Sequence, residues 1–373
     1  MNKIRLSKSV VGEAEKQALA RVIEAGYLGM GNEVQQFEEE IRNFLETDHE
    51  VICVNTGTAA LHLSLQALGI GPGDEVLVPS LTYVATFQAI SATGATPIAC
   101  DVTLNKAFID LNDAEMRVTN CTKAIIPVHY GSNSDGMEAV HHFAKKHGLR
   151  VIEDAAHSFG CSKNGNRIGA DGDITCFSFD GIKNITSGEG GAIVTSDKTV
   201  AQKIKDARLL GVEKDTDHRY AGQRSWTFDV KDQGWRYHMS NLMAAIGREQ
   251  LKKIGIFSEK RQKLSSRYIS ELRGIPNLSF LDFDYENLVP HIFPIIVGGG
   301  QRTALAAALA DDGIETGTHY QPNHLLSYYA TEYSLKVTEE LAQQLLSIPL
   351  HPDVTDADQS RVIHAIKTFL LGV

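Results

Sequence analysis

The chain has 373 residues, of which 43% are hydrophobic and 22% are charged, and its formal net charge at pH 7 is −10. These values are ordinary for a globular protein and leave room for two domains. The acidic balance argues against nucleic acid and against an anionic membrane surface as partners. An anionic small substrate stays open, since a local basic pocket can form on an acidic protein.

The cysteine pattern and the N-terminus point to the cell interior. The five cysteines (53, 100, 121, 161 and 176) show no CxxC pair and no ligand-like spacing with histidine, which predicts reduced thiols and no metal site. Residues 1–9 carry no apolar signal core, and no segment approaches the roughly 18 apolar residues of a membrane span. We therefore expect a soluble, cytoplasmic protein.

In chain order, helical and strand patterns alternate. The spacing of apolar residues predicts helices over 12–25, 33–46, 60–70, 82–93 and 137–148, and strands over 75–79, 96–100, 123–130 and 150–154. This alternation is typical of parallel βαβ units, so the fold class is α/β. A long helical stretch over 240–272, a strand over 291–297 and helices over 302–312 and 355–370 predict a smaller α+β lobe.

One lysine stands in an unusual setting, the stretch FSFDGIKNITSGEGGAIV at 177–194. Its first residues predict the end of a strand, and 192–194 predict another short strand. The glycines between them favour close approach of the backbone to another group. Lys183 is therefore either a solvated loop residue or a chemical group at the mouth of the sheet.

Other polar residues follow predicted strands, and open parallel sheets bind ligands at the carboxyl ends of their strands. Gly57 and Thr58 open a helix, where backbone N–H groups form a ready phosphate site; the alternative is an ordinary helix cap. Asp154 ends an apolar strand and needs a cationic partner unless it caps a helix. Tyr83 is either a platform for a planar ring or a core aromatic. His157 and Ser178 are unremarkable alone.

The combination of these residues indicates pyridoxal 5′-phosphate (PLP). The cofactor needs a phosphate cradle, an aromatic platform, an acid that keeps its pyridine nitrogen protonated and a lysine that attaches to its aldehyde. The sequence offers all four in this order, with the lysine 29 residues after the aspartate.

The stretches VNTGTAALHLSLQALGIGPGDEVLVPSLTYVAT, VIEDAAHSFG, GDITCFSF, GEGGAIVTSD and THYQPNHL resemble the DegT/DnrJ/EryC1/StrS family of PLP-dependent sugar aminotransferases. The resemblance runs from about Ile4 to Phe369. It implies the type I fold of PLP-dependent transferases, with a mixed, mostly parallel seven-stranded sheet in a large domain (1–250) and a small α+β C-terminal domain (251–373). It also implies a homodimer with active sites at the subunit interface.

The resemblance also implies roles for individual residues. Lys183 takes the position of the cofactor-linking lysine and Asp154 that of the pyridinium partner. Tyr83 takes the ring-stacking position, and His157 lies beside the ring. Gly57, Thr58 and Ser178 match the residues that bind the cofactor phosphate.

Two departures from the family pattern concern the substrate. Where the family usually has Gly-x-Asn-Tyr-Arg-Met-Ser, this chain has GWRYHMS (234–240), so Arg236 replaces the asparagine that reaches the partner subunit's phosphate and His238 replaces the arginine. The residues before Lys183 are DGI (180–182) in place of the usual ending in Pro-Thr or Pro-Ser. By this position Arg236 is expected to bind the cofactor phosphate of the partner subunit. We also expect Arg236, His238, His319, Tyr320 and His324 to contact substrate.

The reaction implied by the family is transfer of the amine of L-glutamate to a keto-sugar. The expected acceptor is a nucleotide-linked 4-keto-6-deoxyhexose destined for a surface polysaccharide such as lipopolysaccharide. One alternative is an acid sugar such as an 8-oxo-octulosonate, since Arg236 and the three histidines suit a carboxylate as well as a diphosphate. Two others are a PLP-binding sugar dehydratase, in which histidine would replace Lys183, and a non-catalytic regulator.

Overall fold

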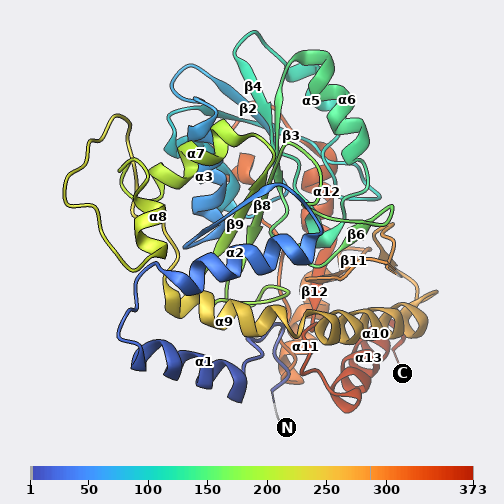
Figure 1. Cartoon of the computed structure of the whole chain (residues 1–373). Helices are drawn as coiled ribbons and strands as arrows, with labels where there is room; N and C mark the ends of the chain where they lie inside the picture. Colours follow the sequence, from blue (N-terminus) through green and yellow to red (C-terminus); the bar gives the residue numbers. More distant parts are fainter. Residues whose placement is uncertain (1–2, 286, 373) are drawn as a thin grey trace.

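The computed structural model describes residues 3–285 and 287–372. Its larger sheet has seven strands in the order β1-β9-β8-β5-β4-β2-β3 (Figure 1). The strands span Glu50–Val54 (β1), Glu75–Pro79 (β2), Thr96–Cys100 (β3), Thr122–Ile125 (β4), Arg150–Asp154 (β5), Ile174–Ser178 (β8) and Gly191–Thr195 (β9). All pairs are parallel except those made by β9, which is antiparallel to β1 and β8. The predicted mixed, mostly parallel sheet is confirmed.

The strands of this sheet are buried on both faces. Because successive side chains of a strand point to opposite faces, each strand contributes apolar side chains to both. In β1, Val51 and Cys53 join one apolar cluster, whereas Ile52 and Val54 join another on the opposite face. Helices pack over both clusters. Those that precede residue 252 are α1 (Glu13–Glu24), α2 (Asn32–Leu45), α3 (Gly57–Ala67), α4 (Val84–Ala92), α5 (Leu111–Arg117), α6 (Met137–His147), α7 (Lys198–Ala207), α8 (Asp215–Tyr220) and α9 (Asn241–Leu251).

A second, antiparallel sheet has the order β10-β11-β12, and a two-stranded hairpin is formed by β6 and β7. These strands span Leu278–Phe280 (β10), Phe293–Val297 (β11), Leu345–Ile348 (β12), Ser162–Lys163 (β6) and Asn166–Arg167 (β7). The later helices are α10 (Ile254–Leu272), α11 (Arg302–Asp311), α12 (Lys336–Gln344) and α13 (Asp356–Leu371). Figure 1 shows α10, α11 and α13 gathered at one end of the molecule. The domain boundary after residue 250 stays a prediction.

Three sequence expectations need correction. The helical stretch over 240–272 is two helices, α9 and α10, separated by a turn at Lys252 and Lys253. The strand expected over 123–130 ends at Ile125, because Pro127 has no N–H for the sheet ladder; beyond it an isolated parallel bridge joins Val128 to Asp154. Strand β1 was not foreseen. Among the described residues, no helix is long and apolar enough to cross a membrane.

The predicted motifs meet at one edge of the larger sheet. Val54 at the end of β1 and Ser178 at the end of β8 both pair with Gly191 at the start of β9, and Asp154 at the end of β5 pairs with Cys176. The segment 179–190, which carries Lys183, leaves β8 and returns to β9 at this same edge.

Candidate active site

A cavity of about 450 Å³ opens at this edge of the sheet. It brings together nine of the predicted site residues, namely Gly57, Thr58, Tyr83, Asp154, His157, Ser178, Lys183, His319 and Tyr320. They come from five separate stretches of the chain, so the topology assembles the site that the motifs predicted.

One end of the cavity is built for an anion. Gly57 and Thr58 are the first two residues of α3, and the hydroxyl of Thr56 caps the helix by accepting the N–H of Ala59 at 3.0 Å. The described residues supply no acceptor for the N–H groups of Gly57 and Thr58, which stay available at the positive end of the helix. A Cβ at position 57 would lie 2.8 Å from Cβ of Ser178, so only glycine permits this close approach.

Asp154 is buried and does not cap a helix. No helix begins between β5 and β6 in the described chain, which rules out the capping alternative. Its Oδ2 accepts a hydrogen bond from Thr86 Oγ1 at 2.8 Å, and its Oδ1 accepts the N–H of Ala156 at 3.2 Å. Thr82 supports Thr86 through a contact of 2.9 Å between their hydroxyl oxygens. The carboxylate is thus oriented into the cavity by hydrogen bonds and can offer a negative charge to a cationic ring nitrogen.

His157 is neutral in a defined tautomer. Burial, with the nearby Lys183 adding to the effect, holds the pKa of His157 well below its usual value. Its Nδ1 accepts the N–H of Gly131 at 3.2 Å, so the proton sits on Nε2, which donates to the hydroxyl of Tyr320 at 3.0 Å. The hydroxyl hydrogen of Tyr320 is then free to donate to a further acceptor.

Lys183 is half-buried, and its surroundings shift the pKa of its amine. Burial lowers the pKa of Lys183 to about 8, although Asp154 and Asp180 oppose this decrease. About a tenth of the amine is therefore neutral at pH 7, far more than for an ordinary lysine, and a nucleophilic amine and a general base both require the neutral form. The solvated-loop alternative does not describe this environment.

Tyr83 lies at the rim of the cavity. It immediately precedes α4, its side chain is 60% exposed, and its ring centroid is 5.6 Å from that of Tyr320. The core-aromatic alternative is wrong, because a core ring would be buried. An exposed aromatic face beside Asp154 and Lys183 suits stacking on a planar ligand.

Three predicted substrate residues lie outside the cavity of the protomer. Arg236 is exposed, and it forms no ion pair with Asp229 or Asp232 within the described chain. His238 is half-buried, and burial lowers its pKa to about 4. His324 is fully buried between Ser80, 2.7 Å from its Nδ1, and Glu339, 3.2 Å from its Nε2. The structure does not bring His324 to the cavity, because both of its ring nitrogens already hold partners within the fold.

The sequence reasoning missed other residues of the cavity. Thr86 lines it one helical turn after Thr82, a spacing that could have been noticed. Asp180 and Glu189 line the cavity from either end of the lysine segment. His291 also lines it, although it lies 108 residues from Lys183 and simply precedes an apolar strand.

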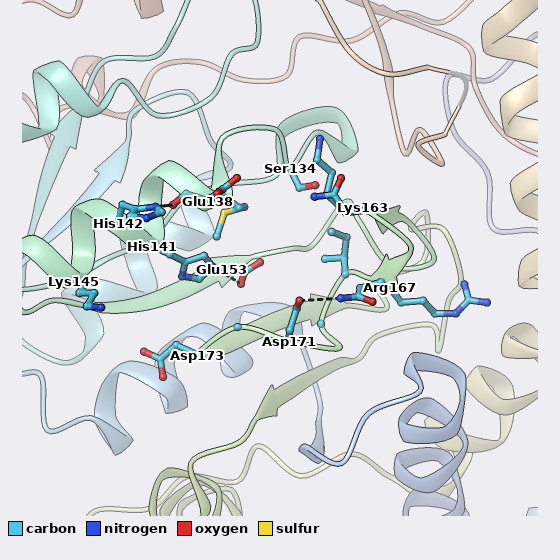
Figure 2. A pocket seen from close by; sticks show the side chains of 16 residues that line it. Ser134, Glu138, His141, His142, Lys145, Glu153, Lys163, Arg167, Asp171 and Asp173 are labelled. Atoms are coloured by element: carbon cyan, nitrogen blue, oxygen red, sulfur yellow. Dashed lines mark hydrogen bonds and ion pairs between the residues drawn. The ribbon is translucent and has the colours of Figure 1, made fainter.

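A larger cavity, of about 590 Å³, lies elsewhere and contains none of the predicted site residues. Figure 2 shows it bounded by α6, β5 and the β6–β7 hairpin, with Glu153 and His141 facing each other. Glu153 and Asp154 are consecutive in β5, so their side chains point to opposite faces of the sheet. We place the active site at the smaller cavity, where Lys183 and Asp154 converge.

The sequence also matches a known protein family. Residues 10–367 match the model of the DegT/DnrJ/EryC1/StrS aminotransferase family. The chain belongs to this family. The resemblance inferred from the motifs is confirmed, and the protein is a PLP-dependent aminotransferase of the sugar aminotransferase family.

Several relatives are similar over almost their whole length. The chain is 37% identical to the spore coat polysaccharide biosynthesis protein SpsC of Bacillus subtilis, over 98% of this chain and 97% of SpsC. It superposes on the aminotransferase TlmJ from Streptoalloteichus hindustanus with a TM-score of 0.92 and 29% identity, covering all of both chains. The PLP form of Spr1654 from Streptococcus pneumoniae gives a TM-score of 0.91 at 26% identity, over 100% of this chain and 99% of that chain.

The residues present fit this cofactor. The free N–H groups at the start of α3 and the hydroxyl of Ser178 suit a phosphate, and the space beside Gly57 would be filled by any Cβ. Asp154 presents a buried carboxylate, and Lys183 supplies an amine of lowered pKa in the same cavity. The side chains present in this cavity can therefore hold PLP as they stand.

Proposed function

We propose that the enzyme transfers the amine of L-glutamate to a keto-sugar, a nucleotide-linked 4-keto-6-deoxyhexose, for synthesis of a surface polysaccharide. The observation that carries this proposal is the 37% identity to SpsC, whose name places it in spore coat polysaccharide biosynthesis. Glutamate is the usual amine donor of the family. The cytoplasmic location stays a prediction.

In this proposal the protein's own side chains bind, orient and move protons. Lys183 would hold the cofactor through its amine and, when free, would act as the base at the substrate carbon, for which its pKa of about 8 is suitable. Asp154 would hold a positive charge at the pyridine nitrogen, Tyr83 would stack on the ring, and His157 orients the hydroxyl of Tyr320. The bound cofactor supplies an electron sink that acidifies the carbon bearing the amine.

Carboxylates at the rim of the cavity suit the hydroxyl groups of an acceptor sugar. Asp180 and Glu189 both line the cavity, and burial, with Asp180 adding to it, raises the pKa of Glu189 above its usual value. Carboxylates accept hydrogen bonds from sugar hydroxyls and repel anionic groups, so the acceptor would place its hydroxyls here and its diphosphate or carboxylate elsewhere. Arg236 and His238 support the acid-sugar alternative only where a partner subunit brings them to the site.

We further propose that the chain works as a homodimer with its active sites at the interface. The segment 221–233, between α8 and the strand-like residues near Arg236, projects from the molecule (Figure 1). It exposes 87% of Trp226, 59% of Phe228 and 48% of Val230. Large apolar side chains gathered on a projecting segment are typical of a protein–protein interface.

A half-reaction with glutamate tests the proposed activity. We expect glutamate to convert the yellow holoenzyme to its colourless amine form and to release 2-oxoglutarate in an amount equal to the active sites. A screen of keto-sugars should then restore the colour, with nucleotide-linked 4-keto-6-deoxyhexoses ahead of 8-oxo-octulosonate. Absence of 2-oxoglutarate would point to the dehydratase or the regulator instead, and preference for the acid sugar would overturn our choice of acceptor.

Arg236 tests the dimeric site. If it binds the partner subunit's cofactor phosphate, Arg236→Ala should weaken cofactor retention by about 10- to 100-fold, the scale of one hydrogen bond to a charged group (about 1.5–3 kcal/mol). Equilibrium dialysis of the cofactor measures this, with Arg273→Ala, an exposed arginine directly after α10, as the matched control. Unchanged retention with a raised KM for the sugar would place Arg236 on the substrate.

Mixed dimers distinguish a contact within a subunit from one across the interface. In a dimer of one Arg236→Ala subunit and one Lys183→Ala subunit, a contact across the interface leaves one site with both side chains intact, so activity returns. A contact within the subunit leaves each site without one of the two, so at limiting cofactor the mixed dimer is no more active than the Arg236→Ala parent.

A further inference from the structure

His291 contacts the reactive lysine and has no role assigned by the sequence motifs. It lies two residues before β11 of the smaller sheet, and its side chain is buried. Its Nε2 is 3.5 Å from Nζ of Lys183, and its ring centroid is 4.5 Å from that of His157. The distance is long for a hydrogen bond, but such contacts often shorten in the working enzyme.

The backbone of His291 is fixed from both sides. Its N–H donates to the hydroxyl oxygen of Ser132 at 3.0 Å, and the same hydroxyl donates to the carbonyl oxygen of His157. The carbonyl oxygen of His291 accepts from the buried guanidinium of Arg261 at 3.1 Å. Because these bonds anchor the peptide on both sides of the residue, the ring has little freedom to leave Lys183.

Packing alone does not account for a histidine at this position. Nδ1 of His291 is buried and has no hydrogen-bond partner among the described residues. An unsatisfied buried polar atom destabilises a fold, and a phenylalanine would fill the same space without one. The nitrogen that does have a neighbour is the one that faces Lys183, which indicates that this contact is the reason for the imidazole.

The surrounding charges make His291 a hydrogen-bond acceptor. Burial and the nearby Lys183 hold the pKa of His291 well below its usual value, so the ring is neutral. The carboxylates that act on Lys183 are Asp154 and Asp180, and the neighbouring rings of His157 and His319 are also neutral, because burial and Lys183 lower their pKa values. An ammonium can only donate, so Nε2 of His291 presents its lone pair and Nδ1 carries the proton.

We propose that His291 is a positioning residue that holds the free amine of Lys183 in the cavity whenever this lysine is not linked to the cofactor. The proposal rests on the proposed role of Lys183. Transamination releases the lysine in one half-reaction and needs it again in the next, and an acceptor at Nε2 keeps the amine from turning towards solvent. Since His291 comes from the side of the smaller sheet, the position of the lysine depends on how the two sheets pack.

The amine of Lys183 in the cofactor-free protein gives a direct test. Its pKa can be measured from the pH dependence of acetic anhydride labelling, followed by peptide mapping. In His291→Phe the ammonium loses its acceptor, so this pKa should fall below about 8 by about one pKa unit or more. His291→Gln retains an acceptor and should restore most of the wild-type value. His351 is another buried histidine with an unpartnered nitrogen, so His351→Phe is the control and should leave the pKa of Lys183 unchanged.

A second measurement does not depend on the variants of His291 folding. In the wild type, ¹⁵N NMR should show His291 as the neutral Nδ1–H tautomer, and the Nε2 resonance should move in Lys183→Ala. The proposal is overturned if the pKa of Lys183 is unchanged in His291→Phe, or if the chemical shift of His291 Nε2 is the same in the wild type and in Lys183→Ala. Attachment of the cofactor to another lysine would instead overturn the proposed function, and the measurements on the cofactor-free protein separate the two failures.

Discussion

Lys183→Ala is expected to abolish transamination and to leave the fold intact. The side chain is half-buried and its nearest polar contact is the long one to His291, so its loss removes little packing. It removes the amine that we propose attaches to the cofactor and moves the proton. Borohydride reduction of the wild-type holoenzyme, followed by peptide mapping, should find the cofactor on Lys183, and thermal unfolding should show an unchanged Tm in the variant.

The pH dependence of cofactor capture adds a second readout for this lysine. Only the neutral amine is nucleophilic, and the pKa of Lys183 is about 8. The rate at which the cofactor-free protein binds PLP should therefore rise with pH through about 8 and level off above it. Lys163→Ala, whose side chain pairs with Asp135 outside the cavity, serves as the control. Reduction onto any lysine other than Lys183 would disprove the assignment.

Asp154→Asn should fold and bind the cofactor but lose transamination by about 10²- to 10⁴-fold. The amide keeps the size of the carboxylate and can still accept from Thr86, but it cannot hold a positive charge at the pyridine nitrogen. Removing one partner of a buried charge pair has an effect of about 3–5 kcal/mol, which corresponds to this loss of rate. Stopped-flow absorbance of the glutamate half-reaction measures the effect.

The neighbouring residue offers a matched control. Glu153 lies in the same strand, is also buried, and faces the other cavity (Figure 2). Glu153→Gln should retain near-normal turnover, since its side chain points away from Lys183. If Asp154→Asn retained near-normal turnover too, Asp154 would have only a structural role.

Much of the fold could be predicted because its elements carry strong local signals. The run at 75–79 is continuously apolar, as a strand buried on both faces must be, and it forms β2. The helix expected at 60–70 forms as α3 but begins earlier, at Gly57, because the hydroxyl of Thr56 caps it. The break between α9 and α10 could not be foreseen, since Lys252 and Lys253 both favour a helix and tertiary packing decides the turn.

The residues of the site also divide into those that the sequence predicts and those that it does not. Lys183, Asp154 and Gly57 stand in motifs whose spacing along the chain has a chemical meaning, and they converge in one cavity. His291 carries no such signal, because its contact with Lys183 depends on the packing of the smaller sheet against the larger one. His324 looked like its neighbour His319 in sequence, yet the chain turns its ring into the fold towards Ser80.

The antiparallel strand β9 has a kinetic consequence. Because β8 and β9 are neighbours that run in opposite directions, the segment 179–190 is tied to the sheet at both ends, at Ser178 and Gly191. A tethered amine meets its target as an intramolecular reactant, and well-oriented reactants of this kind reach effective concentrations on the order of 10⁵–10⁸ M. The short connection between two neighbouring strands therefore limits how far the amine can move, so Lys183 returns to its target by a local rearrangement.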